Sequence, residues 1–435
     1  MRGVRQSRVS ARTARILLAP LLLVASAEST ADDLLRQAWD AQTHGRYLDA
    51  LALDRRAAFG ADCKIRDALP LDIVRQFSTF VDPEPVADPD AKPDWQVSDA
   101  DMAAIAQATA RDALDEIATR AAGTRITILN EDHAVPRSRA FAYQVAKRLR
   151  PLGYDVLAAE TFDNSQDVAA ADKAMRKLVS DGYPRQSTGS YTADPVFASF
   201  VRGALALGYR PANYETTAQT VSKDPAIQIA AREESETNYL VDRVLARNPR
   251  SKILIYVGFH HATEAPILRE GKPTSWMATR LKLRTGIDPL TIDQTTFMPV
   301  PTSVPSRPIY PLAAAKAQGR SIVLMTWGKP LVIGEYAGAV DLQVVHPVVP
   351  PVDGRPGWLA DLDRKPVRIP ERLRPGSGSA LIQAFARNDA VDAVPLDQVM
   401  WDHAAPAPAL MLPAGPVRYA VQMAPAPVCP GRGGL

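Results

Sequence analysis

The stretch Thr124–Glu160 constrains the fold more than any other part of the chain. A short apolar run, Ile126–Leu129, is followed by a segment with helical periodicity from about Pro136 to Leu149, and then by a second apolar run, Tyr154–Ala159. Short apolar runs bounded by charged or turn residues are typical of buried strands, whereas apolar residues three and four positions apart indicate a helix. The stretch therefore predicts a strand–helix–strand unit with its two strands parallel in one sheet.

The same alternation of helix and strand continues toward residue 293. The sequence Leu152-Gly153-Tyr154 before Glu160 has a counterpart in Leu207-Gly208-Tyr209 before Glu215, which supports successive βα units. Further helices are predicted over Asn164–Ser180, Pro195–Leu207, Lys223–Asn248 and Ser275–Leu283, and further strands over Ser251–Val257 and Ile287–Asp293. We therefore predict an α/β fold with a mostly parallel sheet flanked by helices.

Composition divides the chain into five segments. These are a signal peptide at 1–27, an N-terminal helical segment at 32–80, a linker rich in Pro and Asp at 81–98, an α/β core at 99–296, and a Pro-rich, strand-containing accessory region at 297–435. The helical segment begins with a pair of amphipathic helices joined near His44-Gly45. The core begins with one predicted helix over Asp99–Ala122, capped by Ser98. In the accessory region, Arg320–Met325 and Leu331–Ile333 are predicted to form a hairpin.

The N-terminus has the composition of a secretory signal peptide. A basic start is followed by the apolar run Ile16–Val24 and the small-residue site Ala25-Ser26-Ala27. The formal net charge is +3, but five arginines and no acidic residue precede Glu28, so the mature chain would carry −2. A basic surface for nucleic acid is therefore not expected, nor is a stable membrane span after cleavage. We expect an exported protein, periplasmic or secreted.

The chain contains two cysteines, Cys63 and Cys429. In an exported protein they could pair and tie the two ends of the chain together. The alternative is a pair of unrelated thiols, and the sequence alone does not choose between the two arrangements.

Acidic and histidine side chains follow the ends of several predicted strands. They are Glu131 and His133, Glu160, Glu215, and the adjacent pair His260 and His261. The carboxyl ends of parallel strands lie along one edge of a sheet, so these side chains are expected to converge there. The structural alternatives are that Glu160 and Glu215 cap the following helices, and that His260 is a core residue. Because His260 and His261 are adjacent, they are expected to point in different directions.

Imidazole and carboxylate groups together support two kinds of chemistry. They are the ligand set of zinc and similar divalent ions, with a nearby carboxylate fixing the histidine tautomer or serving as a general base. Without a metal, the same groups do acid–base work directly. The sequence contains no phosphate-binding Gly-rich loop, Gly-x-Ser-x-Gly elbow, His-Glu-x-x-His helix or paired Cys-x-x-Cys motif that would favour another chemistry.

Four segments resemble the superfamily that joins erythromycin-esterase-like proteins, ChaN-type haem-uptake proteins and the TraB/Tiki group. They are ILNEDHAVPRSR, the strand end AAETF, AREESETNYLVDRVL and YVGFHHATEAP, and the resemblance covers Thr124–Asp293. The motifs of the family fall here on Glu131 and His133, on Glu160, on Arg232 with Glu233, and on Gly258 with His261. One departure is Asn130, which stands where the family usually has glycine.

The resemblance implies an α/β core with a polar site at the sheet edge. It also implies one of several activities, since its members include metal-dependent proteases, esterase-like hydrolases and haem binders. Our leading hypothesis is an exported, metal-dependent hydrolase of ester or peptide bonds, acting on a small-molecule or peptide substrate. Its predicted catalytic residues are Glu131, His133, Glu160, Arg232 and His261. The predicted ligands of its divalent metal ion are Glu131, His133 and His261.

Two alternatives belong to other classes of protein. The first is a periplasmic haem- or metal-binding protein without turnover, in which Tyr256, His260 and His261 are the candidate iron ligands. The second is an interaction scaffold that has lost the activity of the family. Arg232 has a simpler reading as well, as a surface partner of Glu236 one helical turn along.

Overall fold

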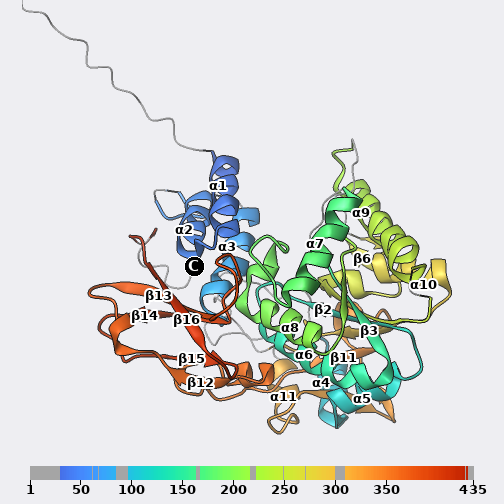
Figure 1. The fold of residues 1–435 in the computed structure, drawn as a ribbon. Coiled ribbons are helices and arrows are strands. Elements are labelled where there is room, and N and C mark those ends of the chain that lie inside the picture. Colours follow the sequence, from blue (N-terminus) through green and yellow to red (C-terminus); the bar gives the residue numbers. More distant parts are fainter. Residues whose placement is uncertain are drawn as a thin grey trace, which may run out of the picture.

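The computed structural model describes residues 30–429, except for 61, 67, 85–96, 163–166, 216–221, 248, 270, 299–308 and 427 (Figure 1). The predicted signal peptide at 1–27 and most of the predicted linker at 81–98 lie outside the described residues. No helix in the described part of the chain is long and apolar enough to cross a membrane.

One large, mostly parallel sheet forms the centre of the fold and confirms the predicted α/β class. The sheet has nine strands in the order β1-β9-β11-β8-β2-β5-β3-β4, with β10 paired to β9. The strands from β11 to β4 in this order run parallel to their neighbours, whereas the pairs made by β9 are antiparallel. The parallel strands are β2 (Ile126–Glu131), β3 (Tyr154–Ala159), β4 (Arg210–Ala212), β5 (Lys252–Gly258), β8 (Leu290–Asp293) and β11 (Leu342–Val345).

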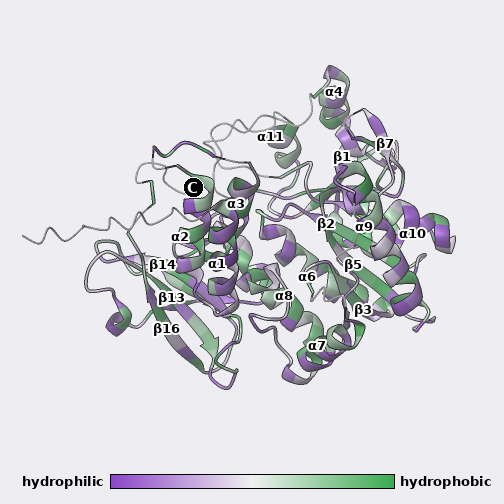
Figure 2. Cartoon of the chain, turned by 90° about the horizontal axis from the view of Figure 1, so that it is seen from above, coloured by the Kyte–Doolittle hydropathy of each residue, from purple (hydrophilic) through white to green (hydrophobic). Residues whose placement is uncertain are grey.

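Helices cover both faces of this sheet, as the apolar character of its strands requires. On one face, Leu129, Leu254 and Tyr256 pack with α5, α6 and α8; on the other, Ile128 and Ile255 pack with α9 and α10. Figure 2 shows the hydrophobic strands between these helices. The core helices are α5 (Ala113–Ala121), α6 (Arg137–Leu149), α7 (Val168–Asp181), α8 (Pro195–Ala206), α9 (Pro225–Tyr239), continued by the π-helical segment η3 (Leu240–Leu245), and α10 (Met277–Thr285).

The prediction of one helix over Asp99–Ala122 is wrong. Helix α4 (Asp99–Gln107) ends early, strand β1 (Thr109–Asp112) follows, and α5 begins at Ala113. Ser98 caps α4 as expected, and Asp112 caps α5 by accepting hydrogen bonds from the amides of Leu114 and Asp115. Because β1 pairs antiparallel with β9 along its whole length, a tertiary interaction overrides the helical propensity of this segment.

Strands from the Pro-rich region extend the central sheet. Strand β9 (Ile322–Thr326) pairs with β10 (Lys329–Pro330) in a hairpin whose turn is Trp327-Gly328, so the hairpin is present but its second strand lies before the predicted Leu331–Ile333. Both turn residues have positive φ, as a two-residue hairpin turn needs. Helix α11 (Ile309–Ala314) packs on α4. Strand β11 follows later in the chain and lies between β9 and β8 in the sheet.

The predicted N-terminal helical pair is present, and a third helix follows it. The helices are α1 (Ala31–Thr43), α2 (Tyr47–Ala58) and α3 (Ala68–Val81). They lie between the α/β core and the C-terminal strands (Figures 1 and 2). The Tyr47 hydroxyl donates to the Ala193 carbonyl at 2.8 Å, and Gln398 donates to the Phe80 carbonyl at 2.6 Å. The helical segment is therefore hydrogen-bonded both to the α/β core and to the C-terminal strands.

The C-terminal residues build a second β structure beside the core. Strands β13, β14 and β16 form an antiparallel sheet, and β12 pairs with β15. Buried Trp401 belongs to the apolar cluster beneath them. The short hairpin β6–β7 lies apart, after β5. The bounds are β6 (Ile267–Arg269), β7 (Lys272–Thr274), β12 (Lys365–Arg368), β13 (Ser379–Ala386), β14 (Asp397–Asp402), β15 (Ala409–Leu412) and β16 (Val417–Met423).

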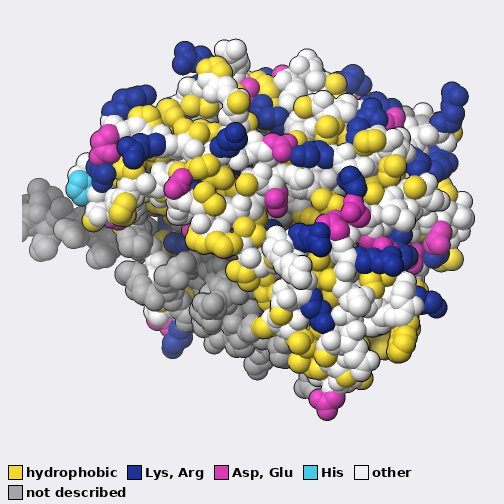
Figure 3. Space-filling model, turned by 90° about the horizontal axis from the view of Figure 1, so that it is seen from below, with side chains coloured by type: hydrophobic (Ala, Val, Ile, Leu, Met, Phe, Trp, Pro, Cys, Tyr) yellow, Lys and Arg dark blue, Asp and Glu magenta, His cyan; other side chains and the backbone are white. Residues whose placement is uncertain are grey.

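The surface seen from below carries charges of both signs. Lysine and arginine are interspersed with aspartate and glutamate between apolar side chains on this face (Figure 3). Such a mixture agrees with the small formal net charge of the chain.

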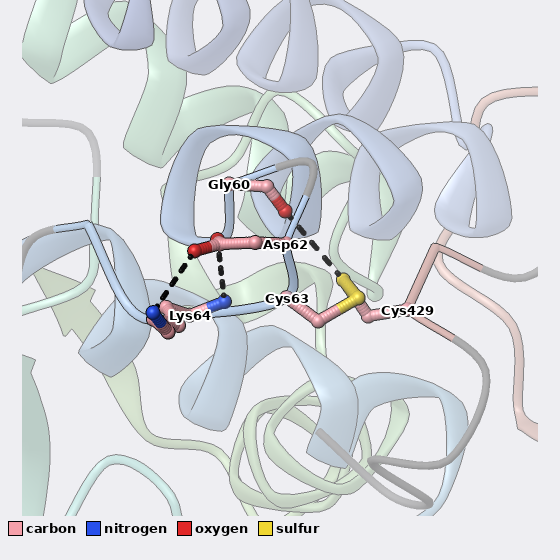
Figure 4. Close-up of a disulfide and its surroundings, with 5 residues drawn as sticks. All are labelled: Gly60, Asp62, Cys63, Lys64 and Cys429. Atoms are coloured by element: carbon pink, nitrogen blue, oxygen red, sulfur yellow. Dashed lines mark hydrogen bonds and ion pairs between the residues drawn. A yellow bond between two sulfur atoms is a disulfide. The ribbon is translucent and has the colours of Figure 1, made fainter.

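Cys63 and Cys429 form a disulfide, so the pairing that the sequence left open is the one in the structure (Figure 4). The bridge joins residues 366 positions apart in the sequence, with their Cα atoms 5.4 Å apart. Cys63 lies in the loop after α2, where Asp62 accepts a hydrogen bond from the Lys64 amide at 3.1 Å. The bridge thus ties the N-terminal helices to the segment after β16.

Replacing both Cys63 and Cys429 by serine is expected to lower the free energy of unfolding by about 2–4 kcal/mol, because the bridge restricts the unfolded chain. Urea denaturation of the wild type with and without reductant measures the effect. The double variant is the control, since reductant should leave its midpoint unchanged. Equal midpoints for oxidised wild type and double variant would contradict the prediction.

Candidate active site

Three parallel strands deliver the candidate residues to one edge of the sheet. Strand β2 ends at Glu131, Glu160 directly follows β3, and β5 ends at Gly258, which is paired with Glu131. The helical turn η4 (Phe259–Ala262) then carries His261. Since β5 lies between β2 and β3, the three strand ends are neighbours. The predicted convergence at the carboxyl edge is therefore the arrangement found here.

Glu131 is fully buried, and its two carboxylate oxygens have partners on every side. Arg139 donates from Nε to Oε2 at 2.7 Å and from Nη2 to Oε1 at 2.8 Å, and Tyr256 donates its hydroxyl to Oε2 at 2.7 Å. His133 Nδ1 lies 2.9 Å from Oε1. Burial raises the pKa of Glu131, but Arg139 and His133 lower it by more, so the carboxylate is ionised.

Arg139 links this carboxylate to a second one. Its Nη1 donates to Asp194 Oδ2 at 2.6 Å, and its Nη2 also donates to the His133 carbonyl at 2.8 Å. Asp194 in turn caps α8. Sequence reasoning did not select Arg139 or Asp194. The only signal for Arg139 was its place on the helix that follows Glu131, and that place does not distinguish it from the other arginines of α6.

His133 faces the solvent with one nitrogen and Glu131 with the other. Its side chain is 24% exposed, and Nε2 lies 4.0 Å from Glu160 Oε2. The ring packs against Tyr191 and Phe259, with centroids 4.7 and 5.4 Å away. Burial lowers the pKa of His133, but the hydrogen bond to Glu131 and the charge of Glu160 outweigh burial and raise it. The pair is a carboxylate–imidazole dyad with a fixed tautomer.

Gly258 leaves room for this imidazole. A Cβ at position 258 would lie 2.6 Å from His133 Cε1 and 2.7 Å from Nε2, which no side chain can tolerate. The Gly258 amide also donates to Glu160 Oε2 at 2.7 Å. Close approach of the backbone, not an unusual φ, explains the glycine here.

Glu160 is ionised and accepts hydrogen bonds from the Tyr191 hydroxyl, the Gly258 amide and the Arg232 guanidinium. The Tyr191 hydroxyl donates to Oε2 at 2.8 Å, and Arg232 Nη2 donates to Oε1 at 2.5 Å. Burial raises the pKa of Glu160, but His261, His133 and Arg232 lower it to well below its usual range. Glu160 is therefore a site residue. The capping alternative is wrong, because Asp167 caps α7 after Glu160 and Asp224 caps α9 after Glu215.

Arg232 extends from α9 into a ring of carboxylates. Its Nε donates to Glu215 Oε1 at 3.0 Å and lies 2.9 Å from Glu236 Oε1. The Nε–H has one direction, so the Glu236 contact is an ion pair without a hydrogen bond. Arg232 does pair with Glu236, but Glu236 is fully buried, so this is not the surface pair that the simpler alternative predicted. Burial, followed by the charge of Glu160, raises the pKa of Glu215 to about 8. Glu215 is thus the protonated member of the ring near pH 7.

His261 lies behind Arg232, against two glutamates of α9. Its Nδ1 is 3.0 Å from Glu233 Oε2 and 3.6 Å from Glu236 Oε2. Burial lowers the pKa of His261, but Glu236 and Glu233 raise it by more. Arg232 Nη1, which can only donate, lies 3.1 Å from Nε2. Nε2 accepts this hydrogen bond only in the neutral ring, whose single proton then lies on Nδ1, facing Glu233.

The candidate haem ligands have separate surroundings. Tyr256 is buried and donates its hydroxyl to Glu131 at 2.7 Å. His260 packs between Trp276 and Tyr336, with ring centroids 5.2 and 5.5 Å away. His261 faces Glu233, so the two adjacent histidines do point in different directions. The structure does not bring Tyr256, His260 and His261 together around one position.

The predicted metal ligands do not converge either. In the described part of the chain, the donor atoms of one group of three lie within 4.8 Å of one another, and that group is Glu233, Glu236 and His261. Glu131 and His133 are not in it, and the oxygens of Glu131 already accept from Arg139, Tyr256 and His133. Of the predicted set, therefore, only His261 has the surroundings of a metal ligand.

Asn130 shows why a glycine is not needed before Glu131. It is a buried residue of β2, and its backbone is not in the positive-φ region. Its side chain donates to the Phe259 carbonyl and to Asp293 Oδ1, both at 3.0 Å, and accepts from the Gln294 amide at 2.7 Å. The asparagine thus ties the ends of β2, β5 and β8 together and supports the turn that presents His261.

A cavity of about 650 Å³ opens over these residues. Four of the lining residues are the charged or titratable groups His133, Glu160, Glu215 and Arg232. The opposite side comes from helices α1 and α3, which sequence reasoning did not connect with the site. The full lining consists of those four with Trp39, Thr43, Gln76, Phe77, Thr161, Phe162, Gln186, Ser187, Gly189, Ser190 and Tyr191.

Comparison with known proteins adds limited information. No protein-family model matches the chain, and no curated protein matches its sequence. Among solved structures, it is similar to the type III effector HopBA1 (15% identity, TM-score 0.29, covering 46% of this chain and 87% of that one). It is also similar to RRSP, a MARTX toxin effector domain from Vibrio vulnificus (15% identity, TM-score 0.31, covering 64% and 61%). A structure of bacterial protein toxins gives similar values (15% identity, TM-score 0.32, covering 56% and 55%). TM-scores this low support no argument about function.

Replacing Arg139 by methionine is expected to destabilise the protein by about 3–5 kcal/mol, because Glu131 and Asp194 would remain buried without a counter-charge. Urea denaturation measures the loss. Arg148→Met is the matched control on the same helix, where the ion pair with Asp115 is exposed and contributes less than about 1 kcal/mol. A similar loss in the two variants would contradict the central place given to Arg139.

Proposed function

We propose that the protein is a hydrolase of ester or amide bonds in which His133 acts as the general base. One observation carries the proposal. Buried Glu131, fixed by Arg139 and Tyr256, holds Nδ1 of His133 at 2.9 Å, while His133 itself lines the cavity. A base oriented by a buried carboxylate and open to a cleft of this size is the arrangement that general-base hydrolysis needs.

The reaction follows from this geometry. Neutral His133 takes a proton at Nε2 from a water molecule, whose oxygen bonds to the carbonyl carbon of the substrate. The carbonyl electrons move to oxygen and give a tetrahedral anion. When the anion collapses, the C–O or C–N bond breaks and His133 returns its proton to the leaving oxygen or nitrogen. The products are a carboxylic acid and an alcohol or amine, and Glu131 stabilises the imidazolium between the two steps.

Arg232 and the carboxylates around it are suited to stabilise the tetrahedral anion. Among the described residues that line the cavity, Arg232 carries the only permanent positive charge. Glu160 holds the guanidinium in place, and Glu215, whose pKa is raised to about 8, can donate a hydrogen bond as a neutral acid. We assign Arg232 to stabilise the developing oxyanion, with His261 positioning it from behind through Nε2.

The predictions from sequence about export, substrate class and superfamily are also proposed here. We propose that the protein is exported and that its substrate is a small molecule or peptide. The disulfide is compatible with an oxidising compartment. The positions of Glu131, His133, Glu160, Arg232 and His261 at one sheet edge support membership of the superfamily named above.

His133→Asn is expected to lower kcat/KM for an ester substrate by at least about 100-fold, since general-base catalysis contributes that much or more. The wild-type profile should rise with pH through a pKa above the ordinary histidine value, because only the neutral ring accepts a proton. In Glu131→Gln the residual rise should move to lower pH, because the charge that raises the pKa is gone. Kinetics across pH with a chromogenic ester test this.

His44→Asn, on an exposed histidine, is the control and should retain wild-type rates. A His133→Asn variant that keeps its turnover would overturn the assignment. A pH profile that does not move in Glu131→Gln would remove Glu131 from it. Circular dichroism of both variants separates loss of the base from loss of the fold.

A second candidate function is binding of a divalent metal ion by Glu233, Glu236 and His261, with or without turnover. The donor atoms lie within 4.8 Å of one another, and one oxygen of Glu233 and both of Glu236 accept no hydrogen bond although they are buried. Burial and the charge of Glu233 raise the pKa of Glu236 although His261 and Arg232 lower it, and a bound cation would lower it further. With Nδ1 bound to a metal, Nε2 of His261 would donate to Glu160 Oε1, now 3.9 Å away.

Titration with Zn²⁺ and Mn²⁺ by calorimetry is expected to give one site, which Glu236→Gln abolishes. Glu234→Gln is the matched control, because Glu234 lies on the same helix but pairs with Arg280 and Arg284 outside this group. His133→Asn should also retain the metal, in contrast to the ligand set predicted from sequence. Binding that is lost in His133→Asn but not in Glu236→Gln would contradict the assignment.

A further inference from the structure

The cavity over His133 has two sides of different chemistry. Its charged and titratable groups all belong to the α/β core. The helices contribute Trp39 and Thr43 from α1 and Gln76 and Phe77 from α3, none of which carries a charge. We call these four side chains the helical wall. The helical wall lies outside the part of the chain that resembles known hydrolases.

Specific contacts fix the helical wall relative to the core. The Gln42 side chain donates to the Ser190 carbonyl at 3.0 Å, and Gln186 donates to the Tyr47 hydroxyl at 2.9 Å. Ser190 and Gln186 themselves line the cavity. These bonds join α1 and α2 to the loop that contains Gln186 and Ser190. The disulfide at Cys63 additionally joins the loop after α2 to the segment after β16.

Trp39 has the exposure of a binding residue. Its side chain is 48% exposed, although tryptophan is usually well buried in a folded protein. The Phe77 ring packs against the tilted ring of Phe80 in the same helix, with centroids 5.0 Å apart, and lines the cavity. Two aromatic rings next to amide and hydroxyl groups offer apolar contact area and hydrogen bonds but no counter-charge, so a charged group placed there would lose hydration without gaining a partner.

We propose that the helical wall selects the substrate and that Trp39 and Phe77 receive a bulky, uncharged ring carried by a small-molecule ester. The proposal rests on the proposed hydrolase function, since it places the scissile carbonyl at His133 and the ring opposite. A cavity of about 650 Å³ lies within the usual range for drug-sized ligands.

Two ethyl esters test the proposal, ethyl acetate and ethyl naphthylpropanoate, with the released acid followed by titration at constant pH, so that only the second substrate carries a ring. Trp39→Ala and Phe77→Ala are each expected to lower kcat/KM for the naphthyl ester at least about fivefold while leaving the acetate within about twofold. Trp327→Ala is the matched control, because Trp327 is 94% exposed in the β9–β10 turn and lines no part of the cavity. Equal losses on both esters would overturn the proposal, since they indicate only a structural role.

A binding measurement separates this proposal from the proposed function. The methyl ketone analogue of the naphthyl ester cannot be hydrolysed, and calorimetry with it reports the helical wall alone. Weaker binding to Trp39→Ala than to wild type supports the helical wall as a binding surface. If neither ester is hydrolysed, this result still stands, and only the proposed hydrolase function is contradicted. Unchanged binding in both Trp39→Ala and Phe77→Ala overturns the wall even if the acetate is hydrolysed.

Discussion

The buried contact between Arg139 and Glu131 is the interaction on which the rest of the site depends. An ionised carboxylate at the end of a central strand is costly unless it is fully paired, and Arg139 supplies two hydrogen bonds to it and a third to Asp194. This arrangement couples the end of β2 to the start of α8. The remaining contact of Glu131 with a titratable side chain of the cavity is the one that orients His133. Stability and chemistry therefore rest on the same guanidinium.

Charge balance divides the rest of the site into two parts. Around His133 the charges balance, since Glu131 and Asp194 meet Arg139 and the His133 ring, which is a cation when protonated. Around Arg232 they are not, because four glutamates meet one guanidinium and a histidine. Such an excess of buried negative charge is relieved by protonation, as at Glu215, or by a bound cation. This difference is why proton transfer is assigned to one part and metal binding to the other.

Much of the fold and part of the site could be predicted from local patterns. Apolar strands separated by helices gave the parallel sheet, and polar residues at the strand exits gave Glu131, His133 and Glu160, because a parallel sheet brings its carboxyl ends together. The same approach failed at Thr109–Asp112, where pairing with a strand more than 200 residues away replaced a predicted helix. Local propensity contains no information about such a partner.

The sequence by itself determined the class of the fold, the edge that carries the candidate site and the types of residue there, because these depend on periodicity and on the order of elements. Only the tertiary structure decided how the residues are used. It paired Glu131 with Arg139, placed His261 beside Glu236, joined Cys63 to Cys429, and set Trp39 across the cavity from His133. The last two join distant parts of the chain, and the geometry of all four arises only when the sheet, the helices and the C-terminal strands pack together.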